Sequence, residues 1–240
     1  MTGSRTGLGK GIALSLAEAG ANLVIHGSKA EGLEEVCSTV RIAGVKAVPA
    51  IADLSIPGSC EQLIDVAMRQ LGSIDILVNN AGFLRRAPAA EYKMQDWTDV
   101  LKVDLDAVFR LSQLAGRHML AQGRGKIINI ASVLSFQGGV FVPSYAAAKG
   151  AVAQLTKALA NEWAAEGIGV NAIAPGYMAT NNTKALREDA ARAKSILDRI
   201  PAGRWGLPED LKGVAVFLAS PASDYVNGHV LIVDGGWMAR

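Results

Sequence analysis

The sequence predicts an α/β fold, a single domain built on a doubly wound parallel sheet, and two observations support this. Apolar runs of strand length alternate along the chain with helical patterns, an order typical of a sheet covered by helices on both faces. The runs are nearly continuous in apolar residues, which is the pattern of strands buried on both sides. No linker, repeat or low-complexity tract divides the 240 residues, so we expect one domain over residues 1–240.

The predicted strands and helices follow one another in regular order. Strands are expected at Ala21–His26, Val45–Ala52, Ile74–Asn79, Lys126–Ala131, Ile168–Ala174 and His229–Val233. Helices are expected between them at Leu8–Ala19, Glu31–Ala43, Ser59–Leu71, Asp96–Gln122, Tyr145–Glu166 and Glu209–Ala219. The stretch 175–208 carries neither pattern, and long irregular insertions of this kind are often lids or binding loops. We therefore expect a substrate loop there.

The first strand of the sheet is expected to be missing. A glycine-rich segment, Thr2–Gly9, opens the first predicted helix, and a nucleotide-binding loop of this type follows a strand. Only Met1 precedes the segment, whereas a strand takes about 5–6 residues. In a doubly wound sheet the missing strand would be central.

Composition argues against several classes of function. The formal net charge is +2 and the basic residues are scattered, whereas nucleic-acid binding favours a basic stripe or patch. The sequence has neither an apolar stretch of about 18 residues nor the layout of a signal peptide. Cys37 and Cys60 lack metal-like spacing. We expect a cytoplasmic protein without a nucleic-acid, membrane or metal partner.

The glycine-rich segment predicts a phosphate site. Glycine admits backbone angles closed to other residues, and the amino end of the following helix offers N–H groups to an anion. Asn79–Gly82, which ends the third predicted strand, allows the backbone to approach a ligand closely. Asp53 follows the second strand, where it suits an adenine amine, although a lone Asp there is also a common helix cap.

The end of the first predicted strand favours NADP slightly over NAD. NAD enzymes of this architecture usually place an acidic residue there to bind the ribose hydroxyls, but Val24–Lys29 offers none. Ser28, Lys29 and Arg5 can donate to a 2′-phosphate. One observation argues against NADP. The residue immediately before the second glycine of the loop is Thr6, which is not basic and so offers no positive charge to the phosphate.

Ser132, Tyr145 and Lys149 predict proton-transfer chemistry. Tyr145 and Lys149 are four positions apart and therefore share a helix face. A free tyrosine has a pKa near 10, and a nearby ammonium group favours the phenolate. Tyr145 could then exchange a proton with an alcohol while a hydride moves, and Ser132 could bond the same oxygen. A surface Tyr-Lys pair is the alternative reading, which the other motifs at strand ends disfavour.

Together these motifs resemble the short-chain dehydrogenase/reductase family from Thr2 to Arg240. The further matching segments are Asn171–Gly176 and Val233–Gly236. The resemblance implies a Rossmann-like sheet of seven strands, an NAD(P) cofactor and a homotetramer. It also implies that Ser132 polarises the carbonyl, that Tyr145 is the acid/base, and that Lys149 holds the nicotinamide ribose.

The cofactor residues implied by the motifs and the resemblance form one set along the strand ends. They are Gly3, Arg5, Thr6, Gly7, Leu8, Ser28, Lys29, Asp53, Leu54, Asn80, Ala81, Gly82, Tyr145, Lys149, Pro175, Gly176, Met178 and Thr180.

Within the family, the segments Ser132–Gly139, Gly176–Thr183 and Ile200–Gly206 are similar to a branch that interconverts keto and hydroxy forms of deoxy sugar acids, of the 2-deoxy-D-gluconate and 2-dehydro-3-deoxy-D-gluconate type. Such a substrate carries a carboxylate, which a pocket recognises with cations or other donors. We expect at least one of Arg85, Arg86 and Gln137 to face it. The alternatives are a reductase of another ketone, such as a 3-oxoacyl thioester or a gluconate-type compound, and a catalytically weak cofactor-binding protein.

Asp104 departs from the family pattern. The family places an active-site Asn in a Val-Asn-Leu context, whereas this chain reads Val103-Asp104-Leu105. A carboxylate near Lys149 would hold its ammonium group and weaken the effect of that group on Tyr145. We therefore count Asp104 with the catalytic residues and expect it to affect proton transfer more than cofactor binding.

Overall fold

Six parallel strands form the centre of the structure, a computed structural model that describes residues 1–239. They are β1 (Leu23–Gly27), β2 (Ala47–Ile51), β3 (Ile76–Asn79), β4 (Gly125–Ile130), β5 (Ile168–Pro175) and β6 (Val230–Val233). β1 pairs with β2, and the other four lie in the order β3-β4-β5-β6. The predicted α/β class and parallel sheet are confirmed; Arg240, the last residue of the expected domain, lies outside the described residues.

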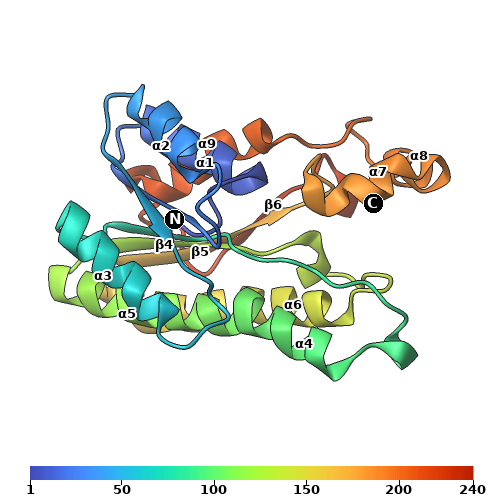
Figure 1. Ribbon diagram of the computed structural model, residues 1–240, viewed down its shortest axis with the longest axis horizontal. Coiled ribbons are helices and arrows are strands. Elements are labelled where there is room, and N and C mark those ends of the chain that lie inside the picture. Colours follow the sequence, from blue (N-terminus) through green and yellow to red (C-terminus); the bar gives the residue numbers. More distant parts are fainter. Residues whose placement is uncertain (240) are drawn as a thin grey trace.

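Helices cover both faces of the sheet (Figure 1). They are α1 (Gly7–Glu18), α2 (Leu33–Arg41), α3 (Ser59–Leu71), α4 (Met94–Leu101), α5 (Ala107–Gln122), α6 (Pro143–Trp163), α7 (Lys184–Glu188), α8 (Ala190–Leu197) and α9 (Lys212–Ala219). α1, α2 and α9 lie on one face, and α3, α5 and α6 on the other. Ile128 packs in the core of the first face and Ile127 in that of the second, both almost fully buried. Strand residues on both sides are therefore apolar, as the continuous runs indicated.

The sheet is divided between β1 and β3. Within residues 1–239 no strand lies between these two, as the sequence led us to expect. Residues 1 and 2 bridge the gap: the amino group of Met1 donates to the carbonyl oxygen of Val24 in β1 (3.1 Å), and the Thr2 N–H donates to that of Val78 in β3 (2.9 Å). A cavity of about 370 Å³ is lined by residues of both strands.

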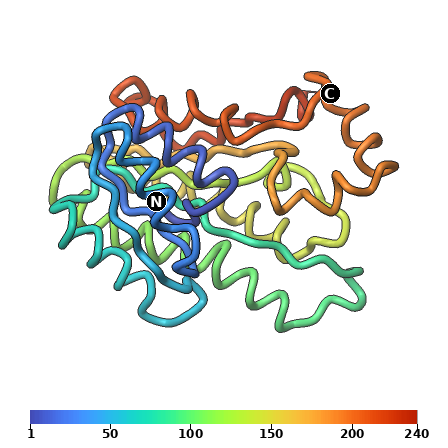
Figure 2. The backbone as a smooth tube through the Cα atoms, turned by 45° about the horizontal axis from the view of Figure 1, so that its top comes forward, coloured from blue at the N-terminus to red at the C-terminus, as the bar shows by residue number. Residues whose placement is uncertain are grey.

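The stretch 175–208, where the sequence shows neither a strand nor a helix pattern and where we expect a substrate loop, contains short helices. It holds a short 3₁₀ turn at Asn181–Thr183 followed by α7 and α8, and Figure 2 shows this segment projecting at one end of the molecule. Asp189 caps α8 by accepting a hydrogen bond from the Arg192 N–H (3.0 Å). These helices have five and eight residues, too few to show a helical repeat in the sequence.

The predicted helix Asp96–Gln122 consists of α4, a π-helical turn at Lys102–Asp106, and α5. The turn matters for the site because it contains Asp104. Among the helices in the described part of the chain, none has the length and apolar character needed to cross a bilayer.

Candidate active site

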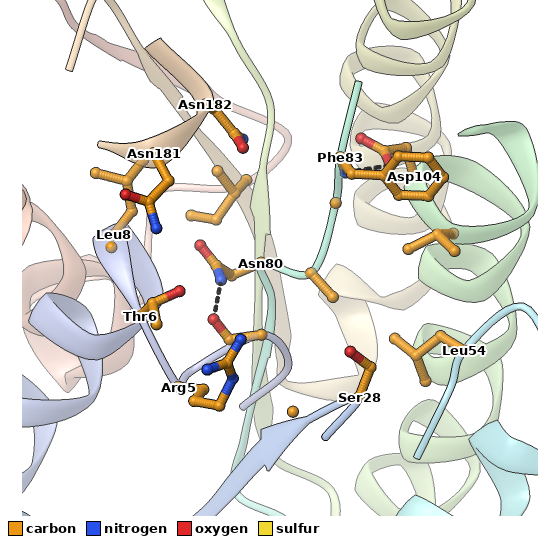
Figure 3. A pocket seen from close by; sticks show the side chains of 18 of the residues that line it. Arg5, Thr6, Leu8, Ser28, Leu54, Asn80, Phe83, Asp104, Asn181 and Asn182 are labelled. Atoms are coloured by element: carbon orange, nitrogen blue, oxygen red, sulfur yellow. Dashed lines mark hydrogen bonds between the residues drawn. The ribbon is translucent and has the colours of Figure 1, made fainter. Parts of the chain in front are cut away.

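A cavity of about 760 Å³ lies at the carboxyl ends of the strands and is called the larger cavity below. The glycine-rich segment, the end of β1 and the residues after β2 and β3 line one part of it. Asp104, Tyr145, Lys149 and Thr180 line another part. Figure 3 shows Arg5 and Ser28 at one end and Asp104 at the other. Folds of this α/β type bind dinucleotides at the carboxyl edge of the sheet. The larger cavity therefore lies where an elongated ligand of that kind would bind.

The glycine-rich segment is held close to the loop after β3. Gly3 has φ +58°, and Asn80 donates from Nδ2 to the Gly3 carbonyl oxygen (2.9 Å). A Cβ at Gly9 would lie 2.1 Å from that same oxygen, so only glycine fits. No side chain caps the amino end of α1, which leaves its first N–H groups available to a phosphate. These features fit a dinucleotide cofactor.

His26 organises this loop, and the sequence reading did not include it. It is buried, and its Nδ1 accepts a hydrogen bond from the Gly3 N–H (3.0 Å). Its Nε2 therefore carries the hydrogen and donates to the Ala52 carbonyl oxygen (2.9 Å). Burial lowers the pKa of His26 to about 4. The sequence offered one signal for this role of His26, namely a histidine within an otherwise apolar strand.

We expect the protein to lose stability as the pH falls below the pKa of a free histidine side chain. The unfolded chain takes up a proton at His26 near pH 6.5, whereas the folded chain does so only near pH 4. The free energy of unfolding therefore falls through this window, by about 2 kcal/mol between pH 7 and pH 5. Urea unfolding at the two pH values measures this. His26→Gln should reduce the loss, and the exposed His229→Gln should not; equal losses in all three proteins would contradict the assignment.

Arg5, Ser28, Asp53 and Leu54 lie at the end of the larger cavity near β1. The Arg5 side chain runs 3.4 Å from the point where a Cβ of Gly27 would be, so the absence of that side chain gives it room. Asp53 accepts two hydrogen bonds from Ser55 (3.0 and 2.7 Å), which lower the pKa of its carboxyl. Lys29, which we expected here, does not line the larger cavity.

Ser132, Tyr145 and Lys149 meet beyond the end of β4. Lys149 is buried, donates from Nζ to the Ile130 carbonyl oxygen (2.9 Å), and lies 5.5 Å from the centre of the Tyr145 ring. Ser135, in the 3₁₀ turn Val133–Ser135, donates from Oγ to the Lys149 carbonyl oxygen (2.6 Å). This bond connects the turn to α6. Burial raises the pKa of Tyr145, and the Lys149 ammonium group opposes this. The arrangement can therefore hold or move a proton at the tyrosine oxygen.

Asp104 lies beside this group. It is fully buried, and its Oδ1 accepts a hydrogen bond from the Phe83 N–H (2.9 Å). Its Oδ2 is 3.5 Å from the Lys149 Nζ. Burial raises the pKa of Asp104, and Lys149 opposes the rise.

A smaller cavity of about 150 Å³ adjoins the first and contains Ser132 and Tyr145 in its wall. Arg86 lines it, and so does Arg192 of α8, which the sequence reading missed. Pro175, Gly176, Met178 and Thr180, which we expected among the cofactor residues, line it as well. Thr180 also lines the larger cavity, so the two cavities meet at this side chain.

The other two expected substrate residues, Arg85 and Gln137, do not line the smaller cavity. Arg85 forms an ion pair with Asp96 (3.5 Å) and lies over the Phe83 ring, at the wall of the larger cavity. Gln137 accepts a hydrogen bond from the Trp237 Nε1 (3.1 Å) and lines neither the larger nor the smaller cavity. Of the three, the structure brings only Arg86 into the smaller cavity.

Comparison with known proteins agrees with this geometry. Residues 3–238 match the model of a family described as enoyl-(acyl carrier protein) reductase. The 2-dehydro-3-deoxy-D-gluconate 5-dehydrogenase of Dickeya dadantii (strain 3937) is 54% identical over 241 residues, covering 100% of this chain and 94% of that protein. The gluconate 5-dehydrogenase of Gluconobacter oxydans (strain 621H) is 44% identical over 236 residues, covering 98% and 92%.

A solved structure is also similar to this chain in both fold and sequence. The gluconate 5-dehydrogenase from Burkholderia cenocepacia J2315, in complex with NADP and tartrate, has a TM-score of 0.95 and 45% identity. The similarity covers 100% of this chain and 94% of that one.

Proposed function

The chain belongs to the short-chain dehydrogenase/reductase family of NAD(P)-dependent oxidoreductases, and from this we propose that its substrate is a deoxy sugar acid of the 2-deoxy-D-gluconate or 2-dehydro-3-deoxy-D-gluconate type. The reaction interconverts a keto and a hydroxy group. The observation that carries this proposal is the smaller cavity, where two arginines line the same space as Ser132 and Tyr145. The name of the Dickeya relative, at 54% identity, supports the same substrate class.

In the proposed reaction, Tyr145 gives or takes a proton at the substrate oxygen, and Ser132 bonds that oxygen. The nicotinamide, when bound, supplies or accepts the hydride. Lys149 offsets the effect of burial on the pKa of Tyr145. Its ammonium group also lines the larger cavity, where it can bind the hydroxyls of the cofactor ribose.

Arg86 and Arg192 would bind the carboxylate of the acid. A guanidinium group recognises a carboxylate through paired N–H donors, and such charge-assisted bonds are strong. The two arginines come from different segments, the loop after β3 and α8, so the position of α8 decides whether Arg192 faces the cavity. We propose that the segment 175–208 acts as a lid whose arginine reaches the substrate.

We expect Arg86→Ala and Arg192→Ala each to raise KM for the acid by about 10- to 100-fold, since a hydrogen bond to a charged group contributes about 1.5–3 kcal/mol. Steady-state kinetics with the acid and with its uncharged amide measure this, and the amide should show little change. Lys194→Ala is the matched control, because Lys194 lies on the same helix and is exposed. An unchanged KM for the acid in both arginine variants would contradict the assignment.

For the cofactor we propose a modest preference for NADP over NAD. Arg5 and Ser28 line the end of the larger cavity near β1, and the strand end carries no acidic residue to repel a phosphate. The Burkholderia relative was solved with NADP.

We expect Arg5→Ala to lower kcat/KM for NADPH by about tenfold or more, through a lost charge-assisted bond, and to leave that for NADH within threefold. Lys29→Ala serves as the control, since Lys29 lies outside the cavity walls. If the wild type used NADH at least tenfold better than NADPH, the preference would be reversed.

The homotetramer and the cytoplasmic location that the sequence suggests also remain proposals. Met94 of α4 and Phe109 of α5 are large apolar side chains that are exposed in the single chain, and burial between subunits would stabilise them. Light scattering of the purified protein measures the number of subunits.

A further inference from the structure

We propose that Asp104 is a positioning residue that pairs with Lys149 and thereby sets the pH at which Tyr145 ionises. The proposal deepens the proposed function, because it rests on Tyr145 as the residue that exchanges the proton. It concerns a side chain that departs from the Val-Asn-Leu pattern implied by the family resemblance, since this chain reads Val103-Asp104-Leu105.

The geometry directs the carboxylate at the lysine. Asp104 lies in the π-helical turn between α4 and α5 and is fully buried. The Phe83 N–H holds Oδ1, and Oδ2 faces the Lys149 Nζ at 3.5 Å. Oδ2 has no hydrogen-bond partner among the described residues, although both side chains line the larger cavity.

The surrounding chain makes room for this carboxylate. A Cβ at Gly82 would lie 2.7 Å from Oδ2, so any larger residue there would push the carboxylate away. On the other side, the Ile130 carbonyl oxygen fixes the Lys149 Nζ. Each of the two charged groups is thus held by a hydrogen bond to the backbone, and their charged atoms lie 3.5 Å apart.

Few other charges face Tyr145. Lys149 follows one turn later on α6, Asp104 faces it from the π-helical turn, and Arg86 approaches from the loop after β3. The two cations favour the phenolate, and the carboxylate opposes them. Pairing with Asp104 therefore cancels part of the help that Lys149 gives to Tyr145. An uncharged side chain at position 104 would leave the ammonium group with its full effect.

A purely structural role would behave differently. If Asp104 served only to accept the Phe83 N–H, the amide oxygen of asparagine would do the same and the ionisation of Tyr145 would not change. The variant Asp104→Asn keeps the shape of the side chain and removes the charge. It therefore separates the two roles.

The test is a pH titration of tyrosinate absorbance on the protein without cofactor, taken as the difference between each protein and its Tyr145→Phe form. We expect Asp104→Asn to lower the midpoint for Tyr145 by about one pH unit, the size of effect that a nearby charge produces. The rise of kcat/KM with pH in the oxidation direction should shift downward equally. Asp106→Asn, an exposed carboxylate of the same turn, should change neither.

A midpoint that stays within about 0.2 pH units, or that moves upward, would overturn the proposal, since it would mean that Asp104 is neutral or acts only through Phe83. Should Asp104→Asn not fold, Asp104→Ser also removes the charge and must show the same downward shift. The absorbance titration needs no substrate. Failure of the wild type to act on sugar acids would therefore count against the proposed function alone.

Discussion

Replacement of Tyr145 by phenylalanine is expected to lower kcat by about 10²- to 10⁴-fold, the contribution of a positioned general acid or base. The change removes only the hydroxyl that exchanges a proton and leaves the ring in place beside Lys149. The dissociation constant for NADPH should stay within about threefold of wild type, because the change removes a single hydroxyl and leaves the other residues proposed to bind the cofactor in place.

Stopped-flow turnover and fluorescence titration with NADPH measure the two quantities separately. Tyr225→Phe is the matched control, since that side chain is fully exposed and lines neither the larger nor the smaller cavity. Activity of Tyr145→Phe within threefold of wild type would show that another group transfers the proton.

Lys149→Ala is expected to reduce both turnover and cofactor affinity, and to destabilise the fold. Lys149 bonds the Ile130 carbonyl oxygen and pairs with Asp104. Its loss would leave the buried carboxylate of Asp104 without its cationic partner, at a cost of about 3 kcal/mol.

A double variant separates these effects. Lys149→Ala with Asp104→Asn removes both charges, so the free energy of unfolding should recover most of the loss while turnover stays low. Urea unfolding and steady-state kinetics on the single and double variants give the comparison. If the double variant regained turnover, Lys149 would act on stability and not on the reaction.

The strands and most helices were predictable because each carries a strong local pattern. β5, for example, is apolar at almost every position and buried throughout, so its position follows from composition alone. α7 and α8 were not predictable, because short helices held by packing and by the Asp189 cap show no repeat. Thus the regular part of the fold was predictable from the sequence, and the segment beside the smaller cavity was not.

The candidate site, too, was predictable from the sequence only in part. The structure brings together Ser132, Tyr145 and Lys149 because one residue follows a strand and the other two share a face of the next helix. Arg192 comes close to them only through the fold of residues 175–208, which no spacing in the sequence reveals. Gln137 is near Ser132 in sequence, yet it turns to Trp237.

The most direct test of the proposed function is NADPH oxidation by the purified protein with three ketones: a keto deoxy sugar acid of the 2-dehydro-3-deoxy-D-gluconate type, 5-keto-D-gluconate, and a 3-oxoacyl thioester. We predict that kcat/KM is at least about tenfold higher for the deoxy sugar acid, because a site built to bond specific groups discriminates strongly against analogues. A higher value for the thioester or for 5-keto-D-gluconate would contradict the substrate assignment. Binding of NADPH without oxidation by any of the three would contradict the enzyme assignment itself.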